Sequence, residues 1–176
     1  MTKSIVLGSG CFWCSEAVFT VIEGVKSTQP GYSGGKVENP SYERVCDGDT
    51  GHAEVTKVDY DPEVISLSEL LDIFFTMHDA TSLNRQGDDV SEQYRSVIFY
   101  DNEDDRIAIM RKMEETQKSY SKKMVTAVER LKNFYPAEEY HKDYFKKNPS
   151  RSYCSAVIRP KVDKIKHTYS QFMVRT

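Results

Sequence analysis

The sequence predicts an α+β protein, a two-layer α/β sandwich with a mixed, mostly antiparallel sheet. Apolar segments with strand-like alternation are separated by segments with helical periodicity, without strict strand–helix–strand repetition. A length of 176 residues suits a single domain, 1–176, and a hydrophobic fraction of 39% is enough for a core. We expect the basic, weakly patterned residues 148–176 to form an irregular C-terminal arm, in which a helix after Val162 is the alternative.

In the N-terminal half, the pattern of apolar residues and turn residues predicts three strands, over 4–7, 25–32 and 52–60. It also predicts two helices, over 12–22 and 66–77. The second of these is the more strongly marked, because Ser66 and Glu69 have the spacing of a capping box and four apolar residues follow on one face.

The C-terminal half predicts a strand over 95–100, a long helix over 102–120, a strand over 124–128 and a short helix over 137–147. The long helix begins with three acidic residues, which suit the positive end of the helix dipole. Pro149 would end the short helix.

Charge and hydropathy exclude several classes of protein. The chain has 24 basic and 27 acidic residues, so its net charge of −3 gives no reason to expect binding to nucleic acid or to an anionic membrane. No apolar run approaches the ~18 residues that span a bilayer. The N-terminus has no signal-like apolar segment. We therefore expect a cytoplasmic protein, acting as a monomer.

Four cysteines stand at positions 11, 14, 46 and 154. In a reducing compartment, a close pair with two scattered cysteines indicates catalytic, redox or metal chemistry. A structural zinc site normally takes two close pairs of ligands, and this sequence has only one. We therefore expect no metal.

The close pair lies where the first strand leads into the first helix. Cys11 would meet unpaired backbone N–H groups and the positive end of the dipole, which favour the reactive thiolate. Phe12 and Trp13 beside it indicate a pocket wall for an apolar group. The alternative is that Cys11, Cys14 and both aromatic residues are ordinary core.

A second candidate is Glu54, which lies among apolar residues of an expected strand. If Glu54 faces inward, burial would raise its pKa and make it a general acid near neutral pH. The alternation alone would instead favour a solvated carboxylate. Tyr42 and Tyr94 could donate hydroxyl groups into a cleft, although the chain has 11 tyrosines.

Together these segments resemble the peptide methionine sulfoxide reductase A family, which is specific for the S epimer. The matching motifs, which cover almost the whole chain, are GCFWCSEAVF at 10–19, GYSGG at 31–35, NPSYERVCDGDTGHAEV at 39–55, YDPEVIS at 60–66, NRQGDD at 84–89, QYRS at 93–96, PAEEYHKDYFKKNP at 136–149 and SYC at 152–154. Several motifs in one order make the resemblance specific.

The resemblance implies that the Cys11 thiolate attacks the sulfoxide sulfur, leaving methionine and a sulfenic acid on Cys11. A second thiol would then form a disulfide with it. Cys154 matches the resolving position of the family, and its place on the arm suits that movement. Cys14, three residues along one helix, is the alternative. Cys46 is expected to be a buried or spare thiol. The resemblance implies thioredoxin as the reductant, with no metal, flavin or nicotinamide.

The other implied roles concern the substrate. Phe12 and Trp13 would surround its methyl group, and Glu54 would protonate the sulfoxide oxygen. The residues implied to hold the oxygen and the substrate are Tyr42, Tyr94 and Asp89. Two departures leave the geometry of the Asp89 loop open: Ala80 replaces a common Pro, and Ser91 a usual Gly.

Two other functions are open from the residues alone. A general dithiol–disulfide oxidoreductase would use Cys11 and Cys14 and would need neither Glu54 nor the tyrosines. A non-catalytic thiol-bearing module, with or without zinc, would bind partners and carry out no reaction.

Overall fold

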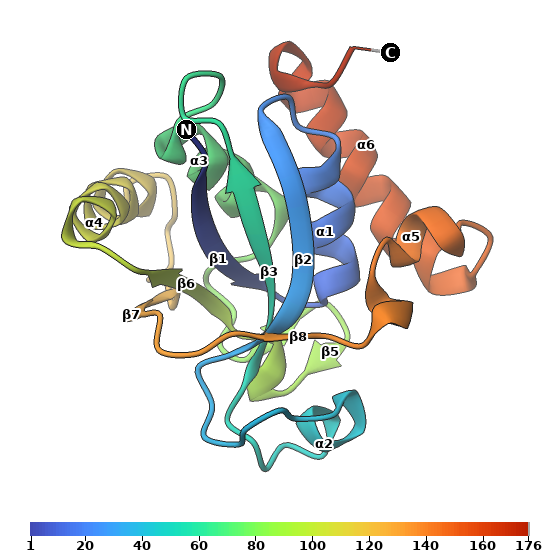
Figure 1. The fold of residues 1–176 in the computed structure, drawn as a ribbon. Coiled ribbons are helices and arrows are strands. Elements are labelled where there is room, and N and C mark those ends of the chain that lie inside the picture. The colour runs from blue at the N-terminus through green and yellow to red at the C-terminus, as the bar shows by residue number, and fades with distance from the viewer. Residues whose placement is uncertain (176) are drawn as a thin grey trace.

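The computed structural model describes residues 1–175. A six-stranded sheet lies at its centre in the order β7-β6-β1-β3-β2-β8 (Figure 1). The strands are β1 (Lys3–Ser9), β2 (Val25–Ser33), β3 (Ala53–Tyr60), β6 (Ser96–Tyr100), β7 (Ala127–Arg130) and β8 (Tyr135–Pro136). Only β6 and β7 pair in parallel, and every other pair of neighbours is antiparallel. The expected α+β class with a mixed, mostly antiparallel sheet is confirmed.

Six α-helices surround this sheet: α1 (Phe12–Thr20), α2 (Tyr42–Cys46), α3 (Leu67–Met77), α4 (Glu103–Gln117), α5 (Tyr144–Lys147) and α6 (Arg159–Thr168). A small hairpin of β4 (Arg85–Gln86) and β5 (Asp89–Val90) stands apart from the sheet. Within residues 1–175, no helix is long and apolar enough to cross a membrane.

The main core lies between the sheet and the helices. Alternate residues of β1 point to opposite faces, so Ile5 and Leu7 join the helix-side core while Val6 joins a smaller cluster on the other face. α1 lies against β2 and β3, and α6 packs on α1 (Figure 1). This packing places the first turn of α1 between the sheet and the C-terminal segment.

The helix over 66–77 begins as its capping box predicts. Ser66 Oγ accepts a hydrogen bond from the backbone N–H of Glu69 at 3.1 Å, and Glu69 Oε2 accepts one from the backbone N–H of Ser66 at 2.8 Å. Two of the unpaired donors at the helix start are thereby satisfied. α3 then buries its apolar face, including Leu70, Leu71 and Phe74.

Two C-terminal expectations differ from the structure. The helix expected over 137–147 is instead a 3₁₀ turn, Glu139–His141, and the four-residue α5, with Asp143 between them in a left-handed conformation (φ 54°). The segment expected to be an irregular arm is helical from Cys154 to Thr168. The reason is that apolar residues three and four apart, among them Val162 and Ile165, are buried there.

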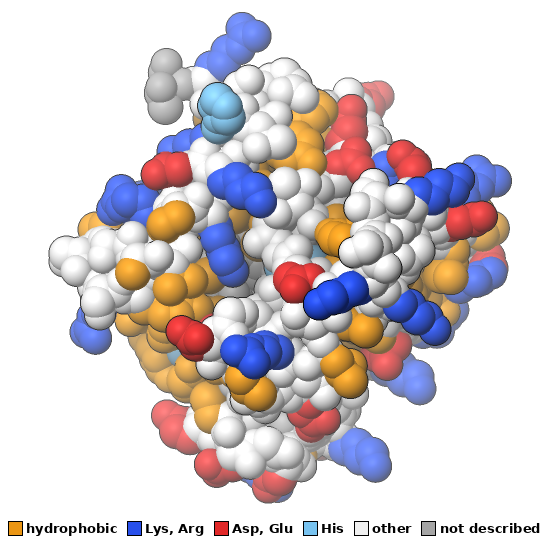
Figure 2. Space-filling model, turned by 180° about the vertical axis from the view of Figure 1, so that it is seen from behind, with side chains coloured by type: hydrophobic (Ala, Val, Ile, Leu, Met, Phe, Trp, Pro, Cys, Tyr) orange, Lys and Arg blue, Asp and Glu red, His pale blue; other side chains and the backbone are white. Residues whose placement is uncertain are grey.

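Charged side chains do not gather by sign on the helix-covered side of the molecule. Figure 2 shows that side with lysines, arginines and acidic residues interspersed, and hydrophobic patches between them. No continuous basic area of the kind that attracts nucleic acid is visible on this face.

Candidate active site

Cys11 stands at the junction of β1 and α1, as the sequence predicts. Gly10 precedes it with φ +102°, and a Cβ there would lie 2.8 Å from Cγ of Gln86, so the turn requires glycine. The carbonyl of Cys11 accepts hydrogen bonds from the backbone N–H groups of Cys14 (3.1 Å) and Ser15 (3.4 Å), which start the helix. The backbone thus fixes Cys11 at the N-terminus of α1.

The thiols of Cys11 and Cys14 lie within hydrogen-bond reach of each other. Burial, followed by the contact with Cys14 and the charge of Glu54, raises the pKa of Cys11 well above its ordinary value. The hydrogen bond from Cys11 lowers the pKa of Cys14 to about 7. At Cys11, desolvation outweighs the single backbone N–H that favours the anion.

Glu54 faces inward from β3, where it pairs with Tyr32 of β2. Only 1% of its surface is exposed. Its Oε1 accepts a hydrogen bond from the backbone N–H of Phe12 at 3.2 Å, next to Cys11. Burial raises the pKa of Glu54 to about 8, although its hydrogen bonds favour the charged form. The carboxyl group therefore carries a proton near neutral pH, and the solvated alternative is wrong.

Gln93 is a site residue that the sequence reasoning missed. Its Nε2 donates a hydrogen bond to Oε2 of Glu54 at 2.7 Å and lies 3.5 Å from Sγ of Cys46. The side chain of Gln93 is almost fully buried. Its place directly before Tyr94 in the QYRS motif was the only available signal, because a glutamine in a polar loop is ordinarily solvated.

Tyr42 and Tyr94 approach Glu54 from different elements, the first turn of α2 and a 3₁₀ turn at Glu92–Tyr94. Burial raises the pKa of each phenol far above its usual value, and the charge of Glu54 is the second cause for both. Asp89 and Cys11 also raise the pKa of Tyr94. Both hydroxyl groups are therefore protonated donors beside the buried acid.

Phe12 and Trp13 have different environments. Phe12 is 1% exposed and packs among Tyr32 and Tyr42, with ring centroids 5.7 and 6.2 Å away. Trp13 is half-buried, and its ring stacks on Tyr144 at 3.7 Å with an interplanar angle of 7°. Trp13 is thus the more accessible of the two aromatic residues, and Phe12 supports the site from behind.

His141 and Tyr144 are further residues that the sequence reasoning missed. Nε1 of Trp13 donates a hydrogen bond to Nδ1 of His141 at 2.9 Å. Burial lowers the pKa of His141, which suits a neutral ring that accepts at Nδ1. Both residues are 128 or more positions from Trp13, so no local pattern could indicate the contact.

Asp89 lies in β5 and contacts the C-terminal segment. Its Oδ2 accepts a hydrogen bond from the hydroxyl of Tyr153 at 2.9 Å, and that hydroxyl is 3.9 Å from Sγ of Cys14. Ser91 has φ 177°, an extended conformation that needs no glycine. Ala80 is buried, and its carbonyl accepts from Val125 N at 2.8 Å. Neither departure from the family pattern strains this loop.

Of the two remaining cysteines, Cys154 differs from expectation, and Cys46 fits the expectation of a spare thiol. Cys154 begins a π-helical turn and is fully buried, with 0% of its surface exposed, instead of lying on a flexible arm. Burial, followed by the charge of Cys14, raises the pKa of Cys154. Cys46 is exposed, on α2.

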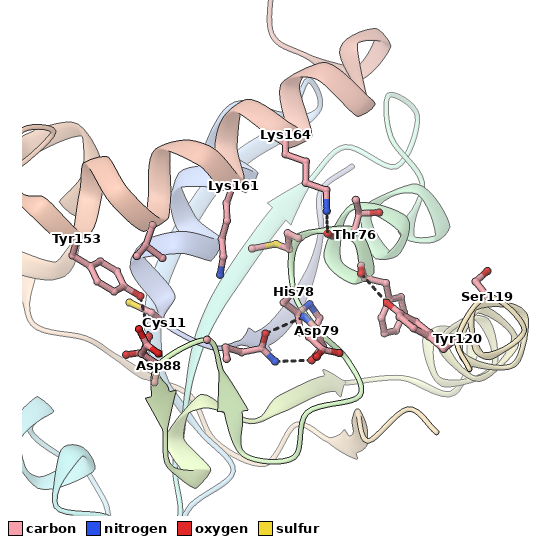
Figure 3. Close-up of a pocket in the computed structure, with 16 residues that line it drawn as sticks. Cys11, Thr76, His78, Asp79, Asp88, Ser119, Tyr120, Tyr153, Lys161 and Lys164 are labelled. Carbon is pink, nitrogen blue, oxygen red and sulfur yellow. Dashed lines mark hydrogen bonds between the residues drawn. The ribbon is translucent and has the colours of Figure 1, made fainter. Parts of the chain in front are cut away.

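A cleft of about 940 Å³ opens beside Cys11 (Figure 3). Its lining includes His78 after α3, Asp88 and Asp89 of the hairpin, and Tyr153 and Lys161 from the C-terminal segment. Figure 3 shows Lys161 extending from α6 into this cleft. Glu54 and Trp13 do not line this cleft.

A metal site finds no support in this geometry. Within residues 1–175, no three histidine, cysteine, aspartate or glutamate side chains are arranged to hold one metal ion. The zinc-bearing alternative therefore has no set of ligands in the described part of the chain.

Known proteins resemble this chain over nearly its full length. The sequence model of the peptide methionine sulfoxide reductase family matches residues 3–173. The peptide methionine sulfoxide reductase MsrA of Campylobacter jejuni (strain RM1221) is 56% identical over 163 residues, which cover 93% of this chain and 98% of that protein. The MsrA of Haloquadratum walsbyi is 46% identical over 171 residues, 97% of this chain and 98% of that one.

Solved structures of methionine sulfoxide reductases are similar to this chain as well. Mxr1 from Saccharomyces cerevisiae in its reduced form has a TM-score of 0.81 at 41% identity, covering 87% of this chain and 89% of that chain. Mxr1 in complex with Trx2 has a TM-score of 0.57 at 30% identity, covering 81% and 84%. Sequence and structure together lead to one conclusion: the chain belongs to the peptide methionine sulfoxide reductase A family.

Proposed function

We propose that this chain reduces the S epimer of methionine sulfoxide, free or within proteins, to methionine, with Cys11 as the nucleophile. Family membership makes it a peptide-methionine (S)-S-oxide reductase. The observation that carries the assignment of residues is the buried, protonated carboxyl group of Glu54 beside the first turn of α1. A sulfoxide oxygen becomes a good leaving group only when it is protonated, and a buried neutral acid supplies that proton.

In the first step the sulfur of Cys11 attacks the sulfur of the sulfoxide. Glu54 gives its proton to the oxygen, while Tyr42 and Tyr94 donate hydrogen bonds to it as its negative charge grows. The attack forms a bond between the two sulfurs, and the thiol proton of Cys11 passes to Glu54, which restores the acid. The hydroxyl group then passes to the sulfur of Cys11 while the S–O bond of the substrate and the new S–S bond break. Methionine leaves with its sulfur reduced by two electrons, and Cys11 is oxidised to a sulfenic acid. Trp13 contacts the methyl group of the substrate, with Phe12 behind it.

Asp89 takes no part in the proton transfer in this proposal. Its carboxylate faces the cleft beside Cys11 and accepts the hydroxyl of Tyr153. It would help to bind the part of the substrate that lies outside the methyl pocket and would order the cleft wall. This assignment agrees with its half-buried position.

In the second step a thiol condenses with the sulfenic acid and releases water. The family resemblance favours Cys154 for this role, and the contact geometry favours Cys14. The Cys14 thiol already lies within reach of Cys11, and its pKa of about 7 supplies thiolate at neutral pH. Cys154 is fully buried at the start of a π-helical turn. We assign the first disulfide to Cys14 and a later exchange to Cys154.

The disulfide requires an external dithiol, and we assign thioredoxin to this role. The yeast relative Mxr1 has been solved with Trx2, which supports this partner. The reducing equivalents then come from thioredoxin, without metal, flavin or nicotinamide in the chain. All residues of the proposed site come from one chain, so a monomer suffices. The four free thiols suit the reducing conditions of the cytoplasm.

The test is reduction of N-acetylmethionine sulfoxide by the purified protein with dithiothreitol. We expect the S epimer to be consumed and the R epimer to remain. Cys11→Ser should abolish the reaction, whereas Cys46→Ser, which changes an exposed thiol, should keep it. Equal consumption of both epimers, or an active Cys11→Ser variant, would contradict the proposal.

A general dithiol–disulfide oxidoreductase is the second candidate, because the Cys11–Cys14 pair has the spacing and contact of such a couple. It predicts efficient reduction of insulin disulfides and no dependence on Glu54. We expect slow insulin reduction, since Cys11 is buried against its neighbours.

A further inference from the structure

A buried carboxylate on α1 takes part in no step described above. Glu16 lies one helical turn after Trp13, and only 2% of its surface is exposed. Its Oε1 accepts a hydrogen bond from the backbone N–H of Asp143 at 2.7 Å. Its Oε2 accepts from Thr28 Oγ1 at 3.1 Å and from Lys142 Nζ at 3.3 Å. Three donors from two distant segments therefore meet at one carboxylate.

These contacts hold the segment His141–Tyr144. Lys142 also donates to the carbonyl oxygen of Thr28 on β2. Asp143 has φ 54°, a left-handed conformation that non-glycine residues seldom adopt, and α5 starts at the next residue. An unusual backbone of this kind persists only where surrounding contacts fix it. The hydrogen bond from Asp143 N to Glu16 is such a contact, and it falls where the expected helix over 137–147 is interrupted.

The same segment contacts Trp13 on two sides. His141, just before Lys142, accepts the indole hydrogen bond at 2.9 Å. Tyr144, just after Asp143, stacks on the indole ring at 3.7 Å. A change in the position of Lys142 and Asp143 would therefore move both residues that orient the indole.

We infer that Glu16 is a positioning residue for substrate binding. Its buried carboxylate fixes the segment His141–Tyr144, and that segment fixes the indole of Trp13 beside Cys11. The inference rests on the proposed function in one respect, namely that Trp13 contacts the methyl group of the substrate. Because Glu16 itself touches no reacting atom, its loss should weaken substrate binding more than the chemical step.

The test uses Glu16→Gln in the full chain, and Trp13 is its built-in reporter because the chain has one tryptophan. We expect a red-shifted emission maximum and stronger quenching by acrylamide than in the unmodified protein. With N-acetylmethionine S-sulfoxide and dithiothreitol, KM should rise about tenfold and kcat should change by less than about twofold. Lys142→Met leaves α1 unaltered, and it should change emission and KM in the same direction to a smaller extent.

Asp105→Asn is the matched control. Asp105 is another buried carboxylate, 4% exposed, and it pairs with Lys3 at 3.3 Å near the start of α4. Its loss should lower stability without changing the emission, quenching or KM. Should Glu16→Gln fail to fold, Lys142→Met carries the same test.

Three outcomes would overturn the inference. One is unchanged emission and quenching in both Glu16→Gln and Lys142→Met. Another is an equal rise of KM in Asp105→Asn, and the third is an unchanged KM in a Glu16→Gln variant with altered emission. Because the fluorescence measurement needs no substrate, it tests the role of Glu16 separately from the proposed reductase activity.

Discussion

Two carboxylates flank Cys11 and have opposite environments. Glu54, on the central strand β3, is 1% exposed and receives hydrogen bonds from Gln93 and from the backbone N–H of Phe12. Asp89, on the small β4–β5 hairpin, is half-buried at the open cleft and receives one from Tyr153. Burial makes Glu54 a proton carrier near neutral pH, whereas Asp89 serves as an acceptor at the cleft wall.

The difference lies in which part of the fold supplies each group. The acid comes from the middle of the sheet, where neighbours on both sides exclude water and fix its position. The cleft wall comes from a hairpin and from the C-terminal helical segment, both of which lie outside the sheet. The structure thus separates the sheet region, which supplies the buried acid, from a cleft wall built by elements outside the sheet.

Glu54→Gln should have the largest effect on the reaction. The amide keeps the shape, and its oxygen can still accept from the backbone N–H of Phe12, but it has no acidic proton to give, so we expect kcat to fall by about 10²–10⁴-fold. Single-turnover formation of methionine at pH 7 measures it, with Asp89→Asn as the matched change on the cleft side. A similar fall in both variants would contradict the division between the two regions.

The cysteines provide the next test. With thioredoxin as reductant, Cys14→Ser should keep one turnover per enzyme and then slow at least about tenfold, because the first disulfide partner is missing. Cys154→Ser should form the first disulfide at the normal rate, which mass mapping of the oxidised protein would show. If Cys154→Ser, and not Cys14→Ser, prevented disulfide formation at Cys11, the first partner would be Cys154.

The sequence predicted the site residues on β3 and at the start of α1 better than those on loops and the C-terminal segments, for a physical reason. The strand–helix junction at Cys11 depends on neighbours such as Gly10, which local patterns report. Glu54 could be recognised as a candidate acid, but only the fold decides that it faces inward. Gln93, His141 and Tyr144 act through contacts across tens of residues, and no periodicity encodes those.

Tertiary contacts outweigh local preferences at two places. The helix N-terminus favours a thiolate, but burial at Cys11 raises the pKa of the thiol more than one backbone N–H lowers it. The helical pattern over 137–147 is interrupted at Asp143, whose backbone N–H bonds to Glu16 instead. In both cases, the residues responsible lie far from the segment in the sequence or depend on how it packs.

Stability should depend on pH through Glu54. Its pKa is about 8 in the folded protein and near 4.5 when unfolded, so the folded state binds the extra proton between these values. The free energy of unfolding is therefore undiminished by Glu54 at low pH, and it falls as the pH rises from about 5 to 8. Glu54→Gln has no group that titrates here. Its free energy of unfolding, relative to that of the unmodified protein, should therefore rise by on the order of a few kcal/mol as the pH rises through that range.

Urea unfolding at pH 5, 6, 7 and 8 measures this difference, with Glu114→Gln on the exposed face of α4 as the control. The control should give a pH-independent difference. A Glu54→Gln difference that stays constant across the same pH values would show that Glu54 keeps its ordinary pKa and is no neutral acid.

Tyr153→Phe should give the smallest effect on the reduction of substrate with dithiothreitol, because its hydroxyl contacts Asp89 and Cys14 and not Glu54. The substitution removes the hydroxyl that donates to Asp89 at 2.9 Å and keeps the ring beside Trp13, at a centroid distance of 6.0 Å. We expect KM for a methionine S-sulfoxide peptide to rise about fivefold with little change in kcat, since a single hydrogen bond contributes roughly 1 kcal/mol. Tyr140→Phe, at a tyrosine that is 52% exposed, is the control. A fall in kcat as large as that of Glu54→Gln would place the Tyr153 hydroxyl in the proton-transfer step, and the two sides of Cys11 would then act as one site.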